Sequence, residues 1–345
     1  MNFEYTPPQT PMEIAFGGHR CVNAFGPINP NDDERLLEFL RSSDVPPRTD
    51  VYINSGGGHV EAAMSMGRIL RDSWLSTHVG QYLLDDTAQL VESPVKQRRF
   101  IDGSCMSAAT LFYLGGRLRF LSPGSQFGVH QFSFRNPVPA IVGRSQILSS
   151  KIARYISDMG IPPEFLELSA LTESTSVDLV DHENLRKLSV VTDGETSVEW
   201  SVQSRGNTLY VRGERDSFYG HHKVCLGFAA PNFYLHTIIE SQGRQEQLVS
   251  AFPLVELSIG MTGDRAIDLS DRCIRVAEGI YTNVISTLTT SEAIELAESD
   301  GFGLRIRAAS DAPLFLGIAP MATKGAEDLI RSFVNCLSND RATTF

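Results

Sequence analysis

The sequence predicts an α/β protein followed by a smaller α+β region. Within the first hundred residues, short β-rich runs alternate with segments whose apolar residues recur at helical spacing. That order is typical of strand–helix–strand crossovers and of a largely parallel sheet. Near residue 195 the pattern changes to a succession of strand-like runs. We therefore expect two domains, 1–195 and 196–345, as a length of 345 residues also favours.

The elements of the first domain follow from local patterns. Gly17-Gly18 separates two strand-like runs, and Asn31 or Asp32 can cap a helix. The polar stretch 81–100 is expected to be an irregular surface insertion. The expected strands cover 12–16, 20–25, 50–54 and 74–80, and the expected helices lie near 36–40, 60–70, 145–159 and 162–171.

The second domain has a weaker pattern. Alternating apolar residues, such as Val198, Trp200 and Val202, predict strands at its start. The stretch 266–299 is expected to be mostly helical, and 326–337 to be a helix. The remaining strand-like runs are 223–228, 233–239, 248–257, 304–308 and 314–318.

Composition excludes several classes of protein. A formal charge of −11 argues against sequence-independent nucleic-acid binding, which needs a basic surface. The five cysteines are dispersed, which is typical of reduced thiols in a cytoplasmic protein and not of a disulfide framework or a zinc site. There is no apolar run long enough to span a membrane and no signal-peptide pattern at the start. No metal or cofactor is expected, and His221-His222 near Cys225 is interpreted as an exposed loop-to-strand junction.

The clearest chemical signal is Ser107 within the small-residue run Gly-Ser-Cys-Met-Ser-Ala-Ala-Thr at 103–110. A serine on a tight turn at a helix start lies where backbone N–H groups favour developing negative charge. His130 comes later, at the end of a strand-like run, and is the candidate base. A serine activated by a histidine indicates acyl transfer.

A triple glycine supplies candidate oxyanion donors. Gly56-Gly57-Gly58 lies between an expected strand and an expected helix, where the backbone can approach a ligand without a Cβ in the way. Neither pattern of a phosphate-binding glycine loop is present. The candidate donors are the N–H groups of Gly57 or Gly58 and of Ala108. A plain flexible turn remains the alternative for the glycines.

Three motifs together resemble one protease family. The run Ile-Asn-Ser-Gly-Gly-Gly at 53–58 is similar to the I-N-S-P-G-G loop of the Clp protease proteolytic subunit (ClpP). The Gly-x-x-x-Ser run ending at Ser107 resembles its nucleophile turn, and Arg-Phe-Leu-Ser-Pro-Gly-Ser at 119–125, leading to Val-His-Gln at 129–131, resembles its histidine segment. The motifs keep the family's order over roughly residues 12–193.

The resemblance implies a fold, an activity and site residues. It implies the ClpP/crotonase-like superfold of repeated ββα units and a serine endopeptidase that hydrolyses peptide bonds without a cofactor. The implied roles are Ser107 as nucleophile, His130 as general base, and Gly57 or Gly58 with Ala108 as oxyanion hole. The family's aspartate corresponds to Asp178, although a one-residue slip would place Val177 there, and Asp181 is placed to cap a helix.

Departures from the family restrict the partners that the resemblance implies. Gly56 replaces the loop proline, and neither 81–100 nor 196–345 has a counterpart in the short family members. The expected partners are a peptide or protein substrate, further copies in a homo-oligomer, and a regulatory protein that contacts 196–345; nucleic acid and membranes are not expected.

Three alternatives to this mechanism and function remain open. A relative of the signal-peptide peptidases would use Lys151 as the base in place of His130. The same fold could also serve as a non-catalytic interaction module. Finally, it could handle acyl-CoA, as crotonase-like enzymes do.

Overall fold

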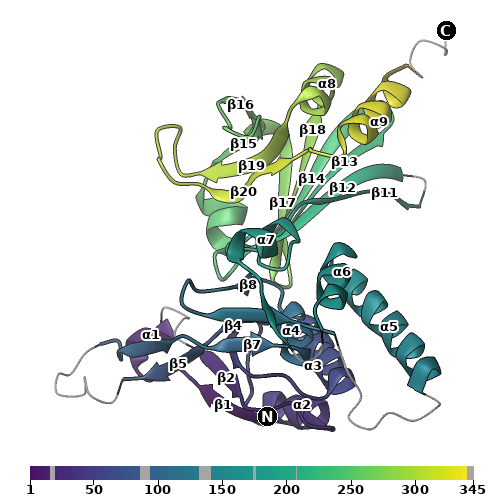
Figure 1. The fold of residues 1–345 in the computed structure, drawn as a ribbon. Coiled ribbons are helices and arrows are strands. Elements are labelled where there is room, and N and C mark those ends of the chain that lie inside the picture. The colour runs from purple at the N-terminus through teal and green to yellow at the C-terminus, as the bar shows by residue number, and fades with distance from the viewer. Residues whose placement is uncertain (16–19, 86–93, 132–140, 174–175, 207, 340–345) are drawn as a thin grey trace. The chain divides into compact units, whose positions relative to one another are not determined.

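A computed structural model of the protein describes residues 1–15, 20–85, 94–131, 141–173, 176–206 and 208–339. The chain forms two compact units, Met1–Gly194 and Glu195–Phe345, which are considered one at a time (Figure 1). Each unit has its own cluster of buried apolar side chains. The architecture is mixed α/β, with several sheets and helices.

The first unit alternates strands and helices through most of its length. Its elements are β1 (Asn2–Thr6), α1 (Pro11–Ala15), β2 (Cys21–Phe25), α2 (Asp32–Ser42), β3 (Asp50–Asn54), α3 (Val60–Asp72), β4 (Ser76–Val79), β5 (Gln81–Leu84), β6 (Arg98–Ile101), β7 (Ser104–Met106), α4 (Ala108–Leu114), β8 (Arg119–Phe120), β9 (Gln126–Val129), α5 (Ile141–Asp158), α6 (Glu164–Leu171), β10 (Asp178–Leu179) and α7 (His182–Lys187).

The first unit contains two larger sheets and the two-stranded pair β5-β6. The larger has the order β1-β2-β3-β4-β8; β1 is antiparallel to β2, and the remaining neighbours are parallel. The smaller has the order β10-β9-β7, with β7 parallel to β9. A parallel bridge between Ser55 and Cys105 connects the end of β3 to β7. The largely parallel sheet expected from the sequence is therefore present.

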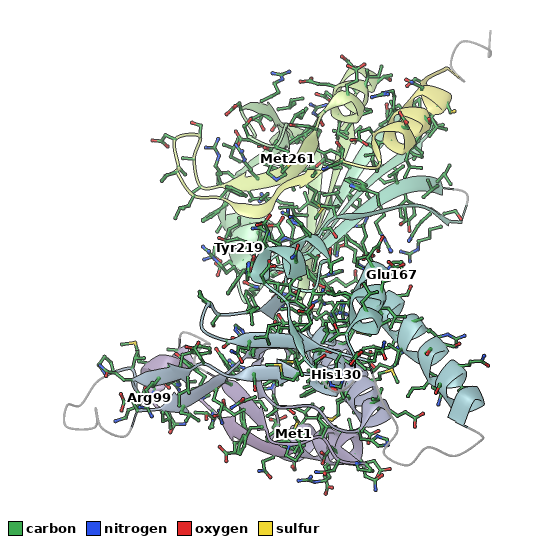
Figure 2. All side chains as sticks on the ribbon, viewed as in Figure 1. Met1, Arg99, His130, Glu167, Tyr219 and Met261 are labelled. Atoms are coloured by element: carbon green, nitrogen blue, oxygen red, sulfur yellow. The ribbon has the colours of Figure 1, made fainter. Side chains whose placement is uncertain are left out.

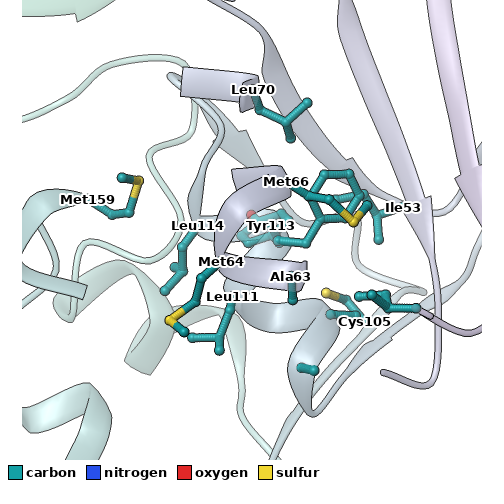
Figure 3. Close-up of a cluster of buried hydrophobic side chains, with 14 of the residues drawn as sticks. Ile53, Ala63, Met64, Met66, Leu70, Cys105, Leu111, Tyr113, Leu114 and Met159 are labelled. Carbon is teal, nitrogen blue, oxygen red and sulfur yellow. The ribbon is translucent and has the colours of Figure 1, made fainter. Parts of the chain in front are cut away.

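The core of the first unit lies where α3 and α4 pack together beside the sheets (Figure 3). Ala63, Met66 and Leu70 supply the buried stripe of α3, as the helical spacing predicts. The helices approach so closely that a Cβ at Gly115 would lie 2.1 Å from the carbonyl oxygen of Gly67. Only glycine fits there. This packing fixes the start of α4, where the candidate nucleophile lies.

Two local predictions for the first unit were wrong. Residues 11–15 form helix α1, not part of a strand, because Pro11 occupies its first position, where proline suits a helix. The stretch 81–100 is not simply irregular: β5 and β6 form an antiparallel pair. The proposed Gly17-Gly18 turn lies outside the described residues.

A buried ion pair attaches α1 to the β5–β6 pair and gives stability a pH dependence. Glu13 accepts hydrogen bonds from Arg98 at 3.0 and 3.1 Å and from the backbone N–H of Lys96 at 2.7 Å. The hydrogen bonds from Arg98, foremost, lower the pKa of Glu13 from 4.5 to about 2.

Because the folded-state pKa is depressed, Glu13 contributes stability that is fully present above pH 4.5 and is lost as the pH falls toward 2. We expect the urea midpoint of Glu13→Gln to fall less between pH 5 and 3 than that of the native chain. Parallel midpoint-versus-pH curves for the two proteins would contradict this.

The second unit is dominated by antiparallel strands. Its elements are β11 (Glu199–Arg205), β12 (Thr208–Ser217), β13 (Gly220–Ala229), β14 (Asn232–Glu240), the π-helical turn η2 (Gln247–Ala251), β15 (Leu254–Ile259), β16 (Arg265–Asp268), the 3₁₀ turn η3 (Ser270–Arg272), β17 (Cys273–Glu278), β18 (Tyr281–Leu288), α8 (Thr290–Glu298), β19 (Gly301–Arg307), β20 (Leu316–Ala322) and α9 (Glu327–Asn339).

These strands form a six-stranded sheet, β11-β12-β13-β14-β18-β17, and a four-stranded sheet, β16-β15-β19-β20. Helices α8 and α9 pack against each other (Figure 1). The helix expected over 326–337 is present as α9, but 266–299 contains three strands before α8. Across the parts of the chain that the structure describes, no helix is both long and apolar enough to cross a membrane.

Candidate active site

Ser107 and His130 come directly after two neighbouring parallel strands. In the β7–β9 register, Met106 is opposite Gly128, so each candidate residue lies just beyond its strand. The N–H of Ser107 donates to the carbonyl oxygen of Gly128 at 2.9 Å. Because the carboxyl ends of parallel strands meet at one sheet edge, the topology brings Ser107 and His130 to the same edge.

The backbone at Ser107 has an unusual conformation. Its φ is 56° and its ψ is −128°, and it is the residue between β7 and the first residue of α4. A positive φ in a residue with a Cβ costs on the order of 1–3 kcal/mol and persists where the surroundings enforce it. Such a strand–turn–helix elbow is how hydrolases expose a nucleophilic hydroxyl at the start of a helix.

Ser107 and His130 line one small pocket with a volume of about 50 Å³. Apart from Thr110 and Ser169, its other walls are apolar side chains from α3 to α6. These walls are Val60, Ala108, Leu111, Ile152, Ile156, Phe165 and Leu166. The pocket therefore offers a small apolar recess beside a hydroxyl and an imidazole.

The glycine loop lies against the elbow. A Cβ on Gly57, whose φ is 101°, would be 2.8 Å from the Cβ of Ser107 and 3.1 Å from the amide nitrogen of Ala108. Only glycine fits at such a distance and at that φ. The Gly57 N–H donates to the Ser55 hydroxyl at 3.1 Å and is therefore already used.

The amides of Gly58 and Ala108 are the remaining candidate donors. Neither has a hydrogen-bond acceptor among the described residues. Ala108 is the first residue of α4, where the N–H has no intrahelical partner and the helix dipole favours negative charge. Of the two glycines predicted as donors, Gly58 is the one whose amide has no acceptor within the described chain.

His130 is oriented by its own neighbour. Its Nδ1 lies 2.6 Å from the carbonyl oxygen of Gln131. That contact favours a proton on Nδ1 and leaves the lone pair on Nε2, the form in which a general base acts. Figure 2 labels His130 in the first unit. In the described structure the imidazole and the Ser107 hydroxyl do not hydrogen-bond to each other.

The structure does not bring Asp178 to His130. Asp178 is exposed, and it pairs with Val129 in the antiparallel β9–β10 register. Val177 and Leu179 lie on the other face of β10, beside Gly128. Continuing this register by one residue places Val177, not Asp178, opposite His130.

Asp181 caps α7, as its position predicts. Its carboxylate accepts from the N–H and the side-chain amide of Asn184 at 2.9 and 2.6 Å. The hydrogen bond from the Asn184 backbone, foremost, lowers the pKa of Asp181. This side chain is therefore engaged in capping the helix and is not held against the imidazole.

Two other side chains near the motifs are also accounted for. Lys151 is half-exposed and pairs with Glu61 at 2.6 Å, so it is not the desolvated base that a Ser–Lys dyad requires. Cys105 is fully buried, and burial raises its thiol pKa, which makes it a core residue and not a nucleophile. Within the described ranges, no three His, Cys, Asp or Glu side chains gather as a metal site would require.

The sequence did not reveal the structural role of Arg119. Its buried guanidinium donates to the carbonyl oxygens of Val190, Gly116 and Ser189 at 2.8, 2.9 and 2.7 Å. These bonds join the turn after α4 to the segment after α7. A buried arginine within a motif could have signalled such a role, because arginine is rarely buried without partners.

Of three comparisons with known proteins, only the one with solved structures gave matches. No family model matches the chain, and no curated protein matches it. Among solved structures, the chain is similar to ClpP1 from Listeria monocytogenes and to a mutant form of that ClpP1. Each comparison has 18% identity and a TM-score of 0.35, and covers 49% of this chain and 86% of the other. Neither likeness says what this chain does.

Proposed function

We propose that the protein is a ClpP-like serine peptidase whose nucleophile is Ser107 and whose general base is His130. The observation that carries the proposal is the elbow at Ser107, with its φ of 56°, between a strand and a helix start. The combination of this φ with a ψ of −128° is strained for a residue with a Cβ, and strained residues cluster at active sites. The shared pocket with His130 supplies the second half of the pair.

The proposed reaction proceeds through an acyl-enzyme. The Oγ of Ser107 attacks the peptide carbonyl carbon while Nε2 of His130 accepts the hydroxyl proton. The carbonyl oxygen becomes an oxyanion near the N–H groups of Gly58 and Ala108. His130 then returns the proton to the leaving amine, the C–N bond breaks, and water hydrolyses the ester by the same route.

The proposed reaction requires Ser107 and His130 to form a hydrogen bond when substrate binds. Proton transfer requires the imidazole and hydroxyl to approach to roughly 2.6–3.2 Å, and such contacts are often loose without substrate. The carbonyl of Gln131 supports the catalytic tautomer through Nδ1 of His130. The small apolar pocket favours an acyl group with a small apolar side chain.

A fluorophosphonate probe tests the proposal directly, because it reacts only with an activated serine. We expect one adduct per chain, located by mass spectrometry on the peptide that contains Ser107, and no adduct on His130→Gln. An adduct on another serine, or equal labelling of His130→Gln, would contradict the assignment. A thermal unfolding curve on each variant shows that the fold is retained.

Replacing Asp178 tests its predicted role as the third member of a triad. Because Asp178 lies opposite Val129 and makes no contact with the imidazole, we expect Asp178→Asn to change kcat/KM less than about threefold. The measurement is the hydrolysis rate of a peptide ester. A loss on the order of 10⁴-fold, as when a true triad aspartate is removed, would restore Asp178 to the mechanism.

A non-catalytic binding module is the second candidate function. It is favoured by one observation: Ser107 and His130 are not hydrogen-bonded to each other, and no carboxylate contacts the ring among the described residues. This alternative predicts no adduct at any pH, with the protein folded. The expected homo-oligomer and the regulatory partner of 196–345 remain predictions.

A further inference from the structure

The second unit contains a cavity of about 410 Å³, far larger than the pocket at Ser107. Its walls come from the ends of β12, β13 and β14, from the segment that leads into η2, and from the loop before β20. The lining residues all belong to the second unit. This volume lies within the range of roughly 300–1,000 Å³ that is usual for small-molecule sites.

Most of the cavity wall is apolar. Ile239 and Leu248 form a buried part, whereas Leu314 and Tyr219 are 81% and 76% exposed. Phe315 lines the same cavity, and the guanidinium of Arg305 lies 5.4 Å from the centre of its ring. Figure 2 labels Tyr219. Large apolar side chains left in water around a cavity are typical of a binding site.

A buried arginine in the wall keeps one donor unused. Arg215 is 6% exposed, and its Nη atoms bind Glu195 and the carbonyl oxygen of Ala319, the latter at 3.0 Å. Its Nε is buried and has no hydrogen-bond partner among the described residues. A buried N–H without an acceptor costs about 1–3 kcal/mol. The Nε is closed to solvent here, so a ligand would reach it only after a shift of the Arg215 side chain.

A second arginine lies at the wall in an exposed position. Arg244 has no carboxylate within 4 Å among the described residues. The acidic residue of the wall, Glu240, accepts the backbone N–H of His221 at 2.9 Å. The cavity thus combines an apolar interior with one carboxylate, Glu240, one arginine paired with Glu195, and one guanidinium, that of Arg244, which lacks an ion pair within the described chain.

We propose that this cavity binds an apolar monocarboxylate, with the apolar body against Ile239, Leu248 and Leu314 and the carboxylate on the arginines. A carboxylate is the group that guanidinium N–H donors recognise best. Two sources share this chemistry: a free aliphatic acid, and the C-terminus of a peptide that ends in an apolar residue. The proposal concerns the second unit and does not depend on the peptidase proposal.

The experiment is calorimetric titration of the full chain carrying Ser107→Ala, so that no peptide is hydrolysed. The probes are octanoate, octanol, octylamine and an acetylated tripeptide ending in leucine, as its free acid and as its amide. We expect octanoate to bind at least about tenfold more tightly than octanol or octylamine, because only the acid pairs with the arginines. Tighter binding by the peptide acid than by octanoate identifies a chain end as the source; the reverse identifies a free acid.

Matched variants locate the binding. Arg244→Gln removes an exposed side chain without threatening the fold, and we expect it to weaken octanoate about fivefold while octanol is unaffected. Leu314→Ala should weaken both ligands about threefold or more, because it removes apolar contact. Arg205→Gln, an exposed arginine of β11 outside the cavity, is the control and should change nothing.

Three results would overturn the proposal. Equal affinity for octanoate and octanol would show that the cavity does not recognise the carboxylate. Equal weakening by Arg205→Gln and Arg244→Gln shows a nonspecific charge effect. No binding of any probe at millimolar concentration would show that the cavity is not a binding site for apolar monocarboxylates. Fluorophosphonate labelling of the native chain is measured separately and does not involve the cavity, which separates a failure here from a failure of the proposed peptidase.

Discussion

Replacing Ser107 with alanine is expected to abolish peptide hydrolysis and fluorophosphonate labelling while leaving the protein folded. In the proposed reaction, the Oγ of Ser107 forms the acyl bond. Removing a serine nucleophile costs roughly 10⁴–10⁶-fold in kcat. The residual rate would come from the oxyanion donors alone. The measurement is single-turnover hydrolysis of a peptide ester, with circular dichroism to compare the folded states.

Ser169 supplies the matched control. It lines the same pocket, and its hydroxyl donates to the carbonyl of Phe165 within α6, so it has a structural partner and no role in the reaction. Ser169→Ala should keep its activity within about threefold of the native chain. If Ser107→Ala hydrolyses the ester as fast as Ser169→Ala, the nucleophile lies elsewhere and the peptidase proposal is wrong.

Replacing Arg119 with methionine is expected to lower the free energy of unfolding by about 3–4 kcal/mol. Methionine fills a similar volume but leaves the carbonyl oxygens of Val190, Gly116 and Ser189 without these donors. Each buried acceptor without a partner costs about 1–3 kcal/mol, and the chain relaxes only in part. Urea unfolding followed by circular dichroism measures the change.

Arg99→Met provides the comparison for that loss. Arg99 is an exposed arginine of β6, so its replacement should change the free energy of unfolding by less than about 0.5 kcal/mol. A similar result for Arg119→Met would show that the buried guanidinium contributes little net stability. Fluorophosphonate labelling of Arg119→Met at a temperature where it stays folded then shows whether the turn after α4 also supports Ser107.

Much of the first unit could be predicted because its signals are local. The strand Asp50–Asn54, the glycine loop and helix Val60–Asp72 follow from a β-rich run, a breaker and a helical stripe. Ser107 and His130 each come after a strand, and two parallel strands end at the same edge. Both residues line one pocket, and their catalytic roles stay predictions.

The predictions that failed depended on information that is not local. A distance along the chain could not say which of residues 177 and 178 meets His130, because that is decided by backbone pairing between β9 and β10. In the second unit, 266–299 was expected to be mostly helical although it contains Ile274, Val276 and Ile285 in two paired strands. Their β-branched side chains favour strands, and that signal was available in the sequence.

The one-residue offset on β10 has a consequence for how this site could have arisen or could be altered. A catalytic carboxylate is absent from the histidine's side of the described strand although an aspartate lies next door, so the distinction between a two-residue and a three-residue catalytic centre depends on a single position, 177. In the proposed mechanism, the orientation of the His130 ring depends on the main-chain carbonyl of Gln131, which no side-chain substitution can remove. Position 177, opposite His130, is then the place where a carboxylate could be added to the proposed site.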